Sequence, residues 1–201
     1  MTIFEKAIHD ATATIESLRP LQPVLEKAAG LVGAAVTGGH KLLVCGNGGS
    51  AADASDFATE YTCRFMTDRQ PYPAINLTAC GSLLTATGND YGFDEVFARQ
   101  VRAFGQKGDV LVCITTSGNS ANILSAIAAA NAAGLHTIAL LGRDGGRARG
   151  LAQTELIVPC NITARIQEAH KFLLHTICEI VEEQWLLPNS PRKPGPSGPV
   201  A

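Results

Sequence analysis

Short apolar runs alternate with helical stretches along most of the chain, and this alternation restricts the possible folds more than any other feature. Such runs leave no polar side for solvent, which is typical of parallel strands covered by helices on both faces. The sequence therefore predicts an α/β fold, a three-layer sandwich in which helices flank a five-stranded parallel sheet. The five runs are KLLVCG, PAINL, DVLVCIT, HTIALLG and ELIVP.

Between and before these runs, Ile, Leu, Val and Ala recur at helical spacing. Residues 3–18 and 22–36, interrupted by Pro20 and Pro23, predict two helices that form a lead-in over residues 1–36. Further helices are predicted over residues 50–65, 81–87, 93–104, 120–133, 146–152 and 163–187.

A chain of 201 residues, 46% of them hydrophobic, is long enough for one sizeable core and short for two independent domains. We therefore expect one domain over residues 1–187. The remainder, PNSPRKPGPSGPVA at residues 188–201, is rich in Pro and Gly and predicts a flexible tail.

Charge and composition argue against several classes of partner. A formal charge of −2, from 16 basic and 18 acidic residues, gives no broad basic field, so no nucleic-acid partner is expected. No apolar run approaches the ~20 residues that span a bilayer, and the charged start MTIFEKAIHD is unlike a signal peptide. We expect a cytoplasmic protein without a membrane partner. Its six cysteines form no CxxC pair and are expected to be buried reduced thiols.

Two segments, LLVCGNGGSAAD at 42–53 and LVCITTSGNSAN at 111–122, echo each other. Each reads as a strand, a loop of small and hydroxyl residues, and the start of a helix. Ligands bind in the crevice at the carboxyl ends of the strands in open α/β sheets. The two loops are therefore expected to face one crevice.

The first loop matches a dinucleotide-binding pattern through Gly46, Gly48 and Ala51. That function also needs an acidic residue at the end of the next strand, where Thr78 and Ala79 stand instead. A nucleotide triphosphate loop would need a Lys after the glycines, and none is present. A glycine-rich turn without a ligand remains an alternative for either loop taken alone.

The second loop carries a cluster of hydroxyl groups beside a predicted helix N-terminus. Hydroxyls and free helix amides suit a phosphate monoester, whose charge the helix dipole also favours. Helix capping by Asn119 or Ser120 accounts for one of these side chains only. The hydroxyls belong to Thr115, Thr116, Ser117 and Ser120.

Four motifs, CGNGGSAADA, GND, TTSGNS and ARIQEAH with a further His, occur together and in order. In these motifs the chain resembles the sugar isomerase (SIS) domain family, in particular the phosphoheptose isomerases acting on sedoheptulose 7-phosphate, from about Ile3 to Leu187. The resemblance implies an aldose–ketose isomerase that forms D-glycero-D-manno-heptose 7-phosphate. It also implies a homotetramer with active sites between subunits.

The resemblance also assigns roles to residues. The phosphate loop corresponds to the four hydroxyl residues above, and the acid/base pair to Glu60 and His175. Many members bind zinc at positions that match Asp56, Glu60, Gln167 and His175. The sugar contacts correspond to Asn47, Gly48, Gly49, Asn89, Asp90 and Gln167.

Asp56 departs from the family, because zinc-binding members carry a histidine at its position. Asp56 and Glu60 are four residues apart and share a helix face, as do Gln167 and His175, eight apart. Two carboxylates, an amide and an imidazole make a harder site that favours manganese or magnesium over zinc. We expect zinc binding to be weak or absent. His170 points away from this face and is expected to be structural.

Isomerisation removes a proton from C1, passes through a cis-enediol(ate) and returns a proton at C2. Glu60 as carbon base and His175 as acid/base at the oxygens fit these steps, with the reverse assignment open. One alternative is a SIS protein without catalysis, either a scaffold resembling the replication-initiator-associating factor or a sugar-phosphate sensor. Another is an isomerase, or a deaminating relative, acting on a different sugar phosphate. Glu60 and His175 favour an enzyme, while no residue fixes the carbon count.

Overall fold

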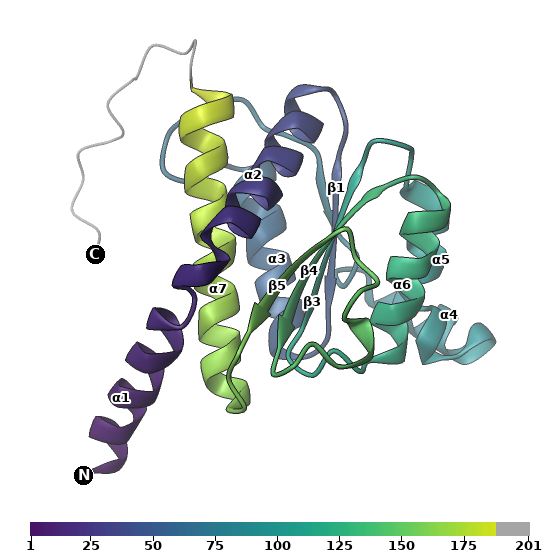
Figure 1. Ribbon diagram of the computed structural model, residues 1–201. Coiled ribbons are helices and arrows are strands. Elements are labelled where there is room, and N and C mark those ends of the chain that lie inside the picture. The colour runs from purple at the N-terminus through teal and green to yellow at the C-terminus, as the bar shows by residue number, and fades with distance from the viewer. Residues whose placement is uncertain (188–201) are drawn as a thin grey trace.

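The sheet matches the prediction in strand number and direction. The structure is a computed structural model that describes residues 1–187, so the predicted tail at 188–201 lies outside the described residues. All strands run parallel, in the order β2-β1-β3-β4-β5 (Figure 1). The strands are β1 (Leu42–Gly46), β2 (Ala74–Asn76), β3 (Val110–Thr115), β4 (His136–Gly142) and β5 (Thr154–Val158).

Helices cover both faces of this sheet, as the apolar strands require. Leu42 and Val44 of β1 belong to one core cluster, and Leu43 and Cys45 to the other, because side chains alternate between the faces of a strand. Each fully buried Leu adds about 1.5–3 kcal/mol. On one side lie α2 (Gln22–Thr37), α3 (Gly49–Thr62) and α7 (Thr163–Val181), and on the other α4 (Gly81–Tyr91), α5 (Ala98–Phe104) and α6 (Ala121–Ala132) (Figure 1).

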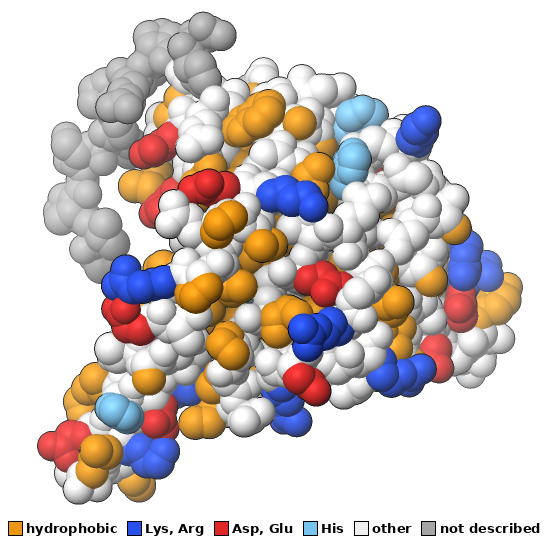
Figure 2. Space-filling view, in the orientation of Figure 1, with side chains coloured by type: hydrophobic (Ala, Val, Ile, Leu, Met, Phe, Trp, Pro, Cys, Tyr) orange, Lys and Arg blue, Asp and Glu red, His pale blue; other side chains and the backbone are white. Residues whose placement is uncertain are grey.

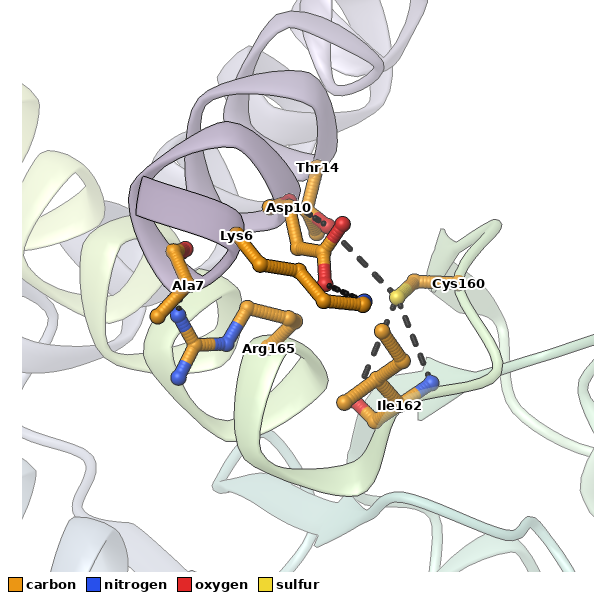
Figure 3. Close-up of polar contacts among 7 residues, drawn as sticks. All are labelled: Lys6, Ala7, Asp10, Thr14, Cys160, Ile162 and Arg165. Carbon is orange, nitrogen blue, oxygen red and sulfur yellow. Dashed lines mark hydrogen bonds and ion pairs between the residues drawn. The ribbon is translucent and has the colours of Figure 1, made fainter. Parts of the chain in front are cut away.

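Helix α1 (Ile3–Glu16) extends away from this body (Figure 1). A capping box closes its first turn, in which Thr2 and Glu5 bond each other's backbone amides. Arg165 at the start of α7 donates to the Ala7 carbonyl over 2.8 Å, and the Thr14 hydroxyl lies 3.5 Å from the Cys160 sulfur (Figure 3). The first part of α1 is therefore attached mainly through α7. A 3₁₀ turn (Arg19–Leu21) leads into α2.

Several helix ends differ from the prediction. Helix α4 continues past residue 87 to Tyr91 and ends at Gly92, whose φ of +88° suits a helix terminus. The stretch 93–104 is divided into a 3₁₀ turn (Phe93–Glu95) and α5, and 146–152 contains only the 3₁₀ turn Gly146–Ala148.

The contact between the end of α3 and the end of α7 explains two further differences. Helix α3 stops at Thr62 rather than at residue 65, and α7 changes at Val181 into a π-helical segment (Glu182–Leu186). The buried Glu182 carboxylate accepts the amide hydrogens of Met66 at 3.0 Å and Thr67 at 2.6 Å. These bonds satisfy backbone amides that a longer α3 would have used internally.

The six cysteines are free thiols, but they are not all buried. Cys45, Cys113 and Cys178 are buried, whereas Cys63 and Cys80 are exposed, contrary to the expectation. The exposed pair lies at helix ends rather than in strands, so the apolar surroundings on which the expectation rested are missing there. Within residues 1–187, no helix has the length and apolar character needed to cross a membrane.

His170 packs against the sheet, in keeping with the structural role expected of it. It is fully buried, and its Nε2 donates to the Leu141 carbonyl over 3.1 Å. Its Nδ1 has no hydrogen-bond partner within the described part of the chain. Burial lowers the pKa of His170 to about 4.

This buried histidine predicts a pH-dependent loss of stability. The unfolded chain takes up a proton on His170 near pH 6.5, whereas the folded chain does so only near pH 4. The protein should therefore lose about 2 to 3 kcal/mol of unfolding free energy between pH 7.5 and 4.5 through this residue. Denaturant unfolding of wild type and His170→Gln at both pH values measures this loss of unfolding free energy. His9→Gln, on exposed α1, is the control and should behave like wild type. Equal pH dependence in wild type and His170→Gln would contradict the prediction.

Candidate active site

The two echoing loops lie side by side at the carboxyl edge of the sheet. Strands β1 and β3 are neighbours, and Gly46 is in register with Ile114, so the loops that follow them start together. Asn47 and Asn122 join the loops through two reciprocal amide bonds of 2.9 Å. Asn122 was missed in the sequence, although it occupies the place in the second echo that Asp53 occupies in the first.

A small cavity of about 70 Å³ opens between these loops. Ser120 is the N-cap residue of α6, but its hydroxyl makes no capping bond, so capping does not account for it. Thr115 and Ser117 use their oxygens to accept amide hydrogens from within the loop, each over 3.2 Å, and keep their own hydroxyl hydrogens for other acceptors. The cavity is lined by Asn47, Ser50, Ile114, Thr115, Thr116, Ser117, Ser120 and Gln167.

Two glycines give this region its shape. Gly118 has a φ of +65°, and a Cβ there would collide with the Gly145 carbonyl. Gly49 opens α3, and a Cβ there would come within 2.9 Å of the side-chain amide carbon of Gln167. Glycine at position 49 therefore allows α7 to bring Gln167 against the N-terminus of α3.

Helices α3 and α7 present opposing polar faces beside the cavity. Asp53, Asp56 and Glu60 follow one another at helical spacing on α3, as do Gln167, Lys171 and His175 on α7. The Lys171 ammonium lies 3.0 Å from Asp53 Oδ1 and also forms an ion pair with Asp56 Oδ2. A second, more open cavity of about 390 Å³ is lined by Gly49, Asp53, Gln167, Glu168 and Lys171.

Lys171 and Asp53 were both missed in the sequence. The signal for Lys171 was present, because it stands four residues from Gln167 and four from His175 on the same helix. Asp53, likewise, precedes Asp56 by three residues. Asp53 lies within the motif CGNGGSAADA and Lys171 stands between ARIQEAH and the further His, but the resemblance assigned a role to neither residue.

Glu60 occupies a partly buried position at the last turns of α3. Burial raises the pKa of its carboxyl, and Asp56 raises it further, while His175, Lys171 and Arg69 act in the opposite direction. Arg69 also bonds the backbone carbonyl of Glu60, which holds the end of the helix in place. The ring of His175 lies 5.7 Å from that of Phe65, centroid to centroid.

The arrangement of donors does not fit a divalent metal. The expected ligands Asp56, Glu60, Gln167 and His175 do come from the two facing helices, but one oxygen of the Asp56 carboxylate is paired with the ammonium of Lys171. Across residues 1–187, no three His, Cys, Asp or Glu side chains are grouped so that they could hold a metal ion. An ammonium paired with one ligand would also repel a dication. Weak or absent zinc binding stays a prediction.

Asn89 and Asp90 lie apart from the other expected substrate contacts. Both are exposed near the end of α4, which covers the opposite face of the sheet from α3 and α7 (Figure 1). Asn89 donates to the Asp90 carboxylate over 2.8 Å, and neither residue lines the two cavities described above. A single chain therefore does not bring them to the crevice.

Known proteins share both the sequence and the fold. The sequence pattern of the SIS domain family matches residues 7–142. A phosphoheptose isomerase from Aliarcobacter butzleri (strain RM4018) is 50% identical over 167 residues, which cover 83% of this chain and 88% of the relative.

Two solved structures are similar over nearly the whole chain. A phosphoheptose isomerase from Neisseria gonorrhoeae has a TM-score of 0.82 and 43% identity, covering 90% of this chain and 100% of the other. A phosphoheptose isomerase from Francisella tularensis has a TM-score of 0.85 and 39% identity, covering 92% of this chain and 100% of the other. The chain belongs to the SIS domain family, within its group of phosphoheptose isomerases.

Proposed function

We propose that the protein is an aldose–ketose isomerase that converts sedoheptulose 7-phosphate into D-glycero-D-manno-heptose 7-phosphate. One observation carries this proposal: Gln167 forms a wall of the hydroxyl-lined cavity and stands on the same helix face as His175, opposite Glu60. Gln167 thus connects the proposed phosphate site to the two facing helices that carry the proposed proton-transfer groups, so all three would act on one substrate. The names of the relatives support the heptose substrate.

The phosphate would bind in the small cavity. Its oxygens would accept hydrogen bonds from the hydroxyls of Thr115, Thr116, Ser117 and Ser120, next to the N-terminus of α6. The uncapped helix end favours the negative charge. Asn47 and the backbone at Gly48 and Gly49 would then face the sugar.

The chemistry would be carried out by Glu60 and His175. Glu60 would take a proton from C1, exchange it with solvent and deliver a proton at C2, while His175 would move protons between the oxygens on C1 and C2. The raised pKa of Glu60 makes it a stronger base than an ordinary carboxylate, which favours abstraction of a carbon-bound proton. No step requires a metal at Asp56.

We also propose that the active form is a homotetramer with sites between subunits. Ile3, Phe4 and Ile8 are exposed on α1, and apolar side chains appear on this helix in Figure 2. The exposed fractions of the first two, 92% and 73%, are high for large apolar side chains and indicate a surface for another copy. Assembly would also allow Asn89 and Asp90 of one subunit to reach the crevice of another.

Two further properties belong to this proposal. Six free thiols support a reducing compartment, in agreement with a cytoplasmic enzyme. Neither a nucleic-acid partner nor a membrane partner is needed for the reaction, and the near-neutral charge offers no field for a polyanion.

A panel of sugar phosphates tests the function. Sedoheptulose 7-phosphate should be consumed and an aldose formed, whereas pentose and hexose phosphates should react more slowly. Faster conversion of a pentose or hexose phosphate would overturn the assignment of sedoheptulose 7-phosphate as the substrate. If sugar phosphates bind but none is converted, the protein would be a non-catalytic SIS protein, either a sugar-phosphate sensor or a scaffold.

Ser120→Ala tests the phosphate position. Removing one hydroxyl that bonds a charged group should cost about 1.5–3 kcal/mol, equivalent to roughly a 10- to 100-fold rise in KM. The turnover number should change much less, because the phosphate does not react. Steady-state kinetics measure both constants. Ser125→Ala, inside α6 and outside the cavity lining, is the matched control, and an unchanged KM for Ser120→Ala would exclude Ser120 from phosphate binding.

A further inference from the structure

Lys171 carries a positive charge into the space between α3 and α7. Its ammonium contacts two carboxylates of the facing helix, Asp53 at 3.0 Å and Asp56. The Asp53 side chain is only 10% exposed and that of Lys171 only 29%, so this pair is shielded from water more than an ordinary surface ion pair. The contact joins the two helices that supply Glu60 and His175.

The charges of this face require such a cation. Asp53, Asp56 and Glu60 place three carboxylates on successive turns of α3, and they would repel one another without a positive partner. Lys171 neutralises the first two and leaves Glu60 free of any ion pair within the described residues. The ammonium thus gives Asp53 and Asp56 a structural role as its ion-pair partners and leaves the Glu60 carboxylate available for the proposed reaction.

The same contact opposes the binding of a metal ion at its expected place. A dication held by Asp56, Glu60, Gln167 and His175 would have to share the Asp56 carboxylate with the ammonium of Lys171, which already binds one of its two oxygens. It would also lie within a few ångströms of a like charge. Lysine and dication therefore compete for the same carboxylate.

We propose that Lys171 is a built-in cation that takes the place of a metal in this crevice, so that the protein works without one. Lys171 is a positioning residue: it acts through Asp53 and Asp56, fixing α3 against α7. The catalytic part of the inference rests on the proposed isomerase function, whereas the exclusion of metal does not.

Zinc binding to purified protein tests the exclusion directly, without substrate. Isothermal titration of wild type with ZnCl₂ should detect weak or no binding at this site. Lys171→Met keeps the length of the side chain and removes its charge, so zinc affinity should rise about tenfold or more, the order expected when a unit charge near a dication is lost. Lys171→Arg keeps the charge and should bind zinc as weakly as wild type.

Controls and a second readout keep the test decisive. Lys27→Met, at a lysine that bonds the Gln153 carbonyl on the surface, should leave zinc affinity unchanged. Asp56→Ala in the Lys171→Met background should abolish the gained affinity if zinc uses the freed carboxylate. Circular dichroism checks that each variant is folded. If Lys171→Met does not fold, wild type and Lys171→Arg still decide the matter, because tight stoichiometric zinc in either overturns the proposal.

Measurements of enzyme activity provide a further test of the proposal. Wild-type turnover, once established, should be unchanged after dialysis against a chelator, and Lys171→Arg should retain more activity than Lys171→Met. Loss of turnover on chelation, restored by zinc, would overturn the proposal. Absence of any isomerase activity would refute the proposed function alone, since the zinc titrations would stand unaffected.

Discussion

Glu60→Gln should lower kcat by roughly 10²- to 10⁴-fold, the range contributed by a general base. The amide has nearly the same shape as the carboxylate but cannot take the proton from C1. KM should change little, because the phosphate and hydroxyl contacts lie elsewhere in the crevice. Steady-state conversion of sedoheptulose 7-phosphate measures both constants.

The position of Glu60 makes this substitution informative. Within residues 1–187 Arg69 bonds only its backbone carbonyl and Lys171 pairs with Asp53 and Asp56 instead, so the substitution removes no hydrogen bond or ion pair of the side chain. Glu179→Gln, at an exposed site on α7, is the matched control and should retain full activity. Wild-type kcat in a folded Glu60→Gln protein would remove Glu60 from the mechanism.

His175→Asn should also lower kcat by roughly 10²- to 10⁴-fold, because the oxygens on C1 and C2 would lose their proton carrier. If Glu60 is the carbon base, this variant should still exchange the C1 hydrogen with solvent faster than it forms aldose. Deuterium exchange followed by NMR separates the two steps.

The same experiment distinguishes the two acid/base assignments. Exchange at C1 that is lost in His175→Asn but retained in Glu60→Gln would reverse the roles of the two residues. His136→Asn, at the amino end of β4 and so away from the carboxyl edge of the sheet, serves as the matched control and should leave kinetics unchanged.

The sheet was predictable because its continuous apolar strands are compatible with few folds. Runs such as LLVCG and VLVCIT are buried on both faces, and only a parallel sheet between helix layers accommodates them. Helix ends were less predictable, because they depend on distant contacts. The end of α3 is set by Glu182, more than a hundred residues along the chain.

The loops of the site were predictable from their echo, since loops after neighbouring parallel strands must meet at one edge of the sheet. The bond between Asn47 and Asn122 was not, because it depends on the register of β1 and β3. The facing of α3 and α7 followed from the resemblance. The ion pairs of Lys171 did not, because the resemblance assigned no role to that position.

The position of Asn89 and Asp90 in a single chain does not explain a role in substrate binding. The resemblance in their motif, GND, implied sugar contacts. The structure instead places both residues near the end of α4, on the opposite side of the sheet from α3 and α7. Residues contributed across a subunit interface follow from neither the sequence nor the fold of a single chain. The oligomeric state of the protein in solution therefore bears directly on the function of these two residues.

Proton transfer through Glu60 is proposed to isomerise a heptose phosphate in this crevice. Its most direct test is incubation of the wild-type protein with sedoheptulose 7-phosphate in deuterated water, with and without a chelator, followed by NMR of the products. An aldose heptose phosphate labelled at C2 should form equally well in both samples and should not form with Glu60→Gln. An unlabelled substrate after prolonged incubation, alongside labelling of a pentose or hexose phosphate, would contradict it.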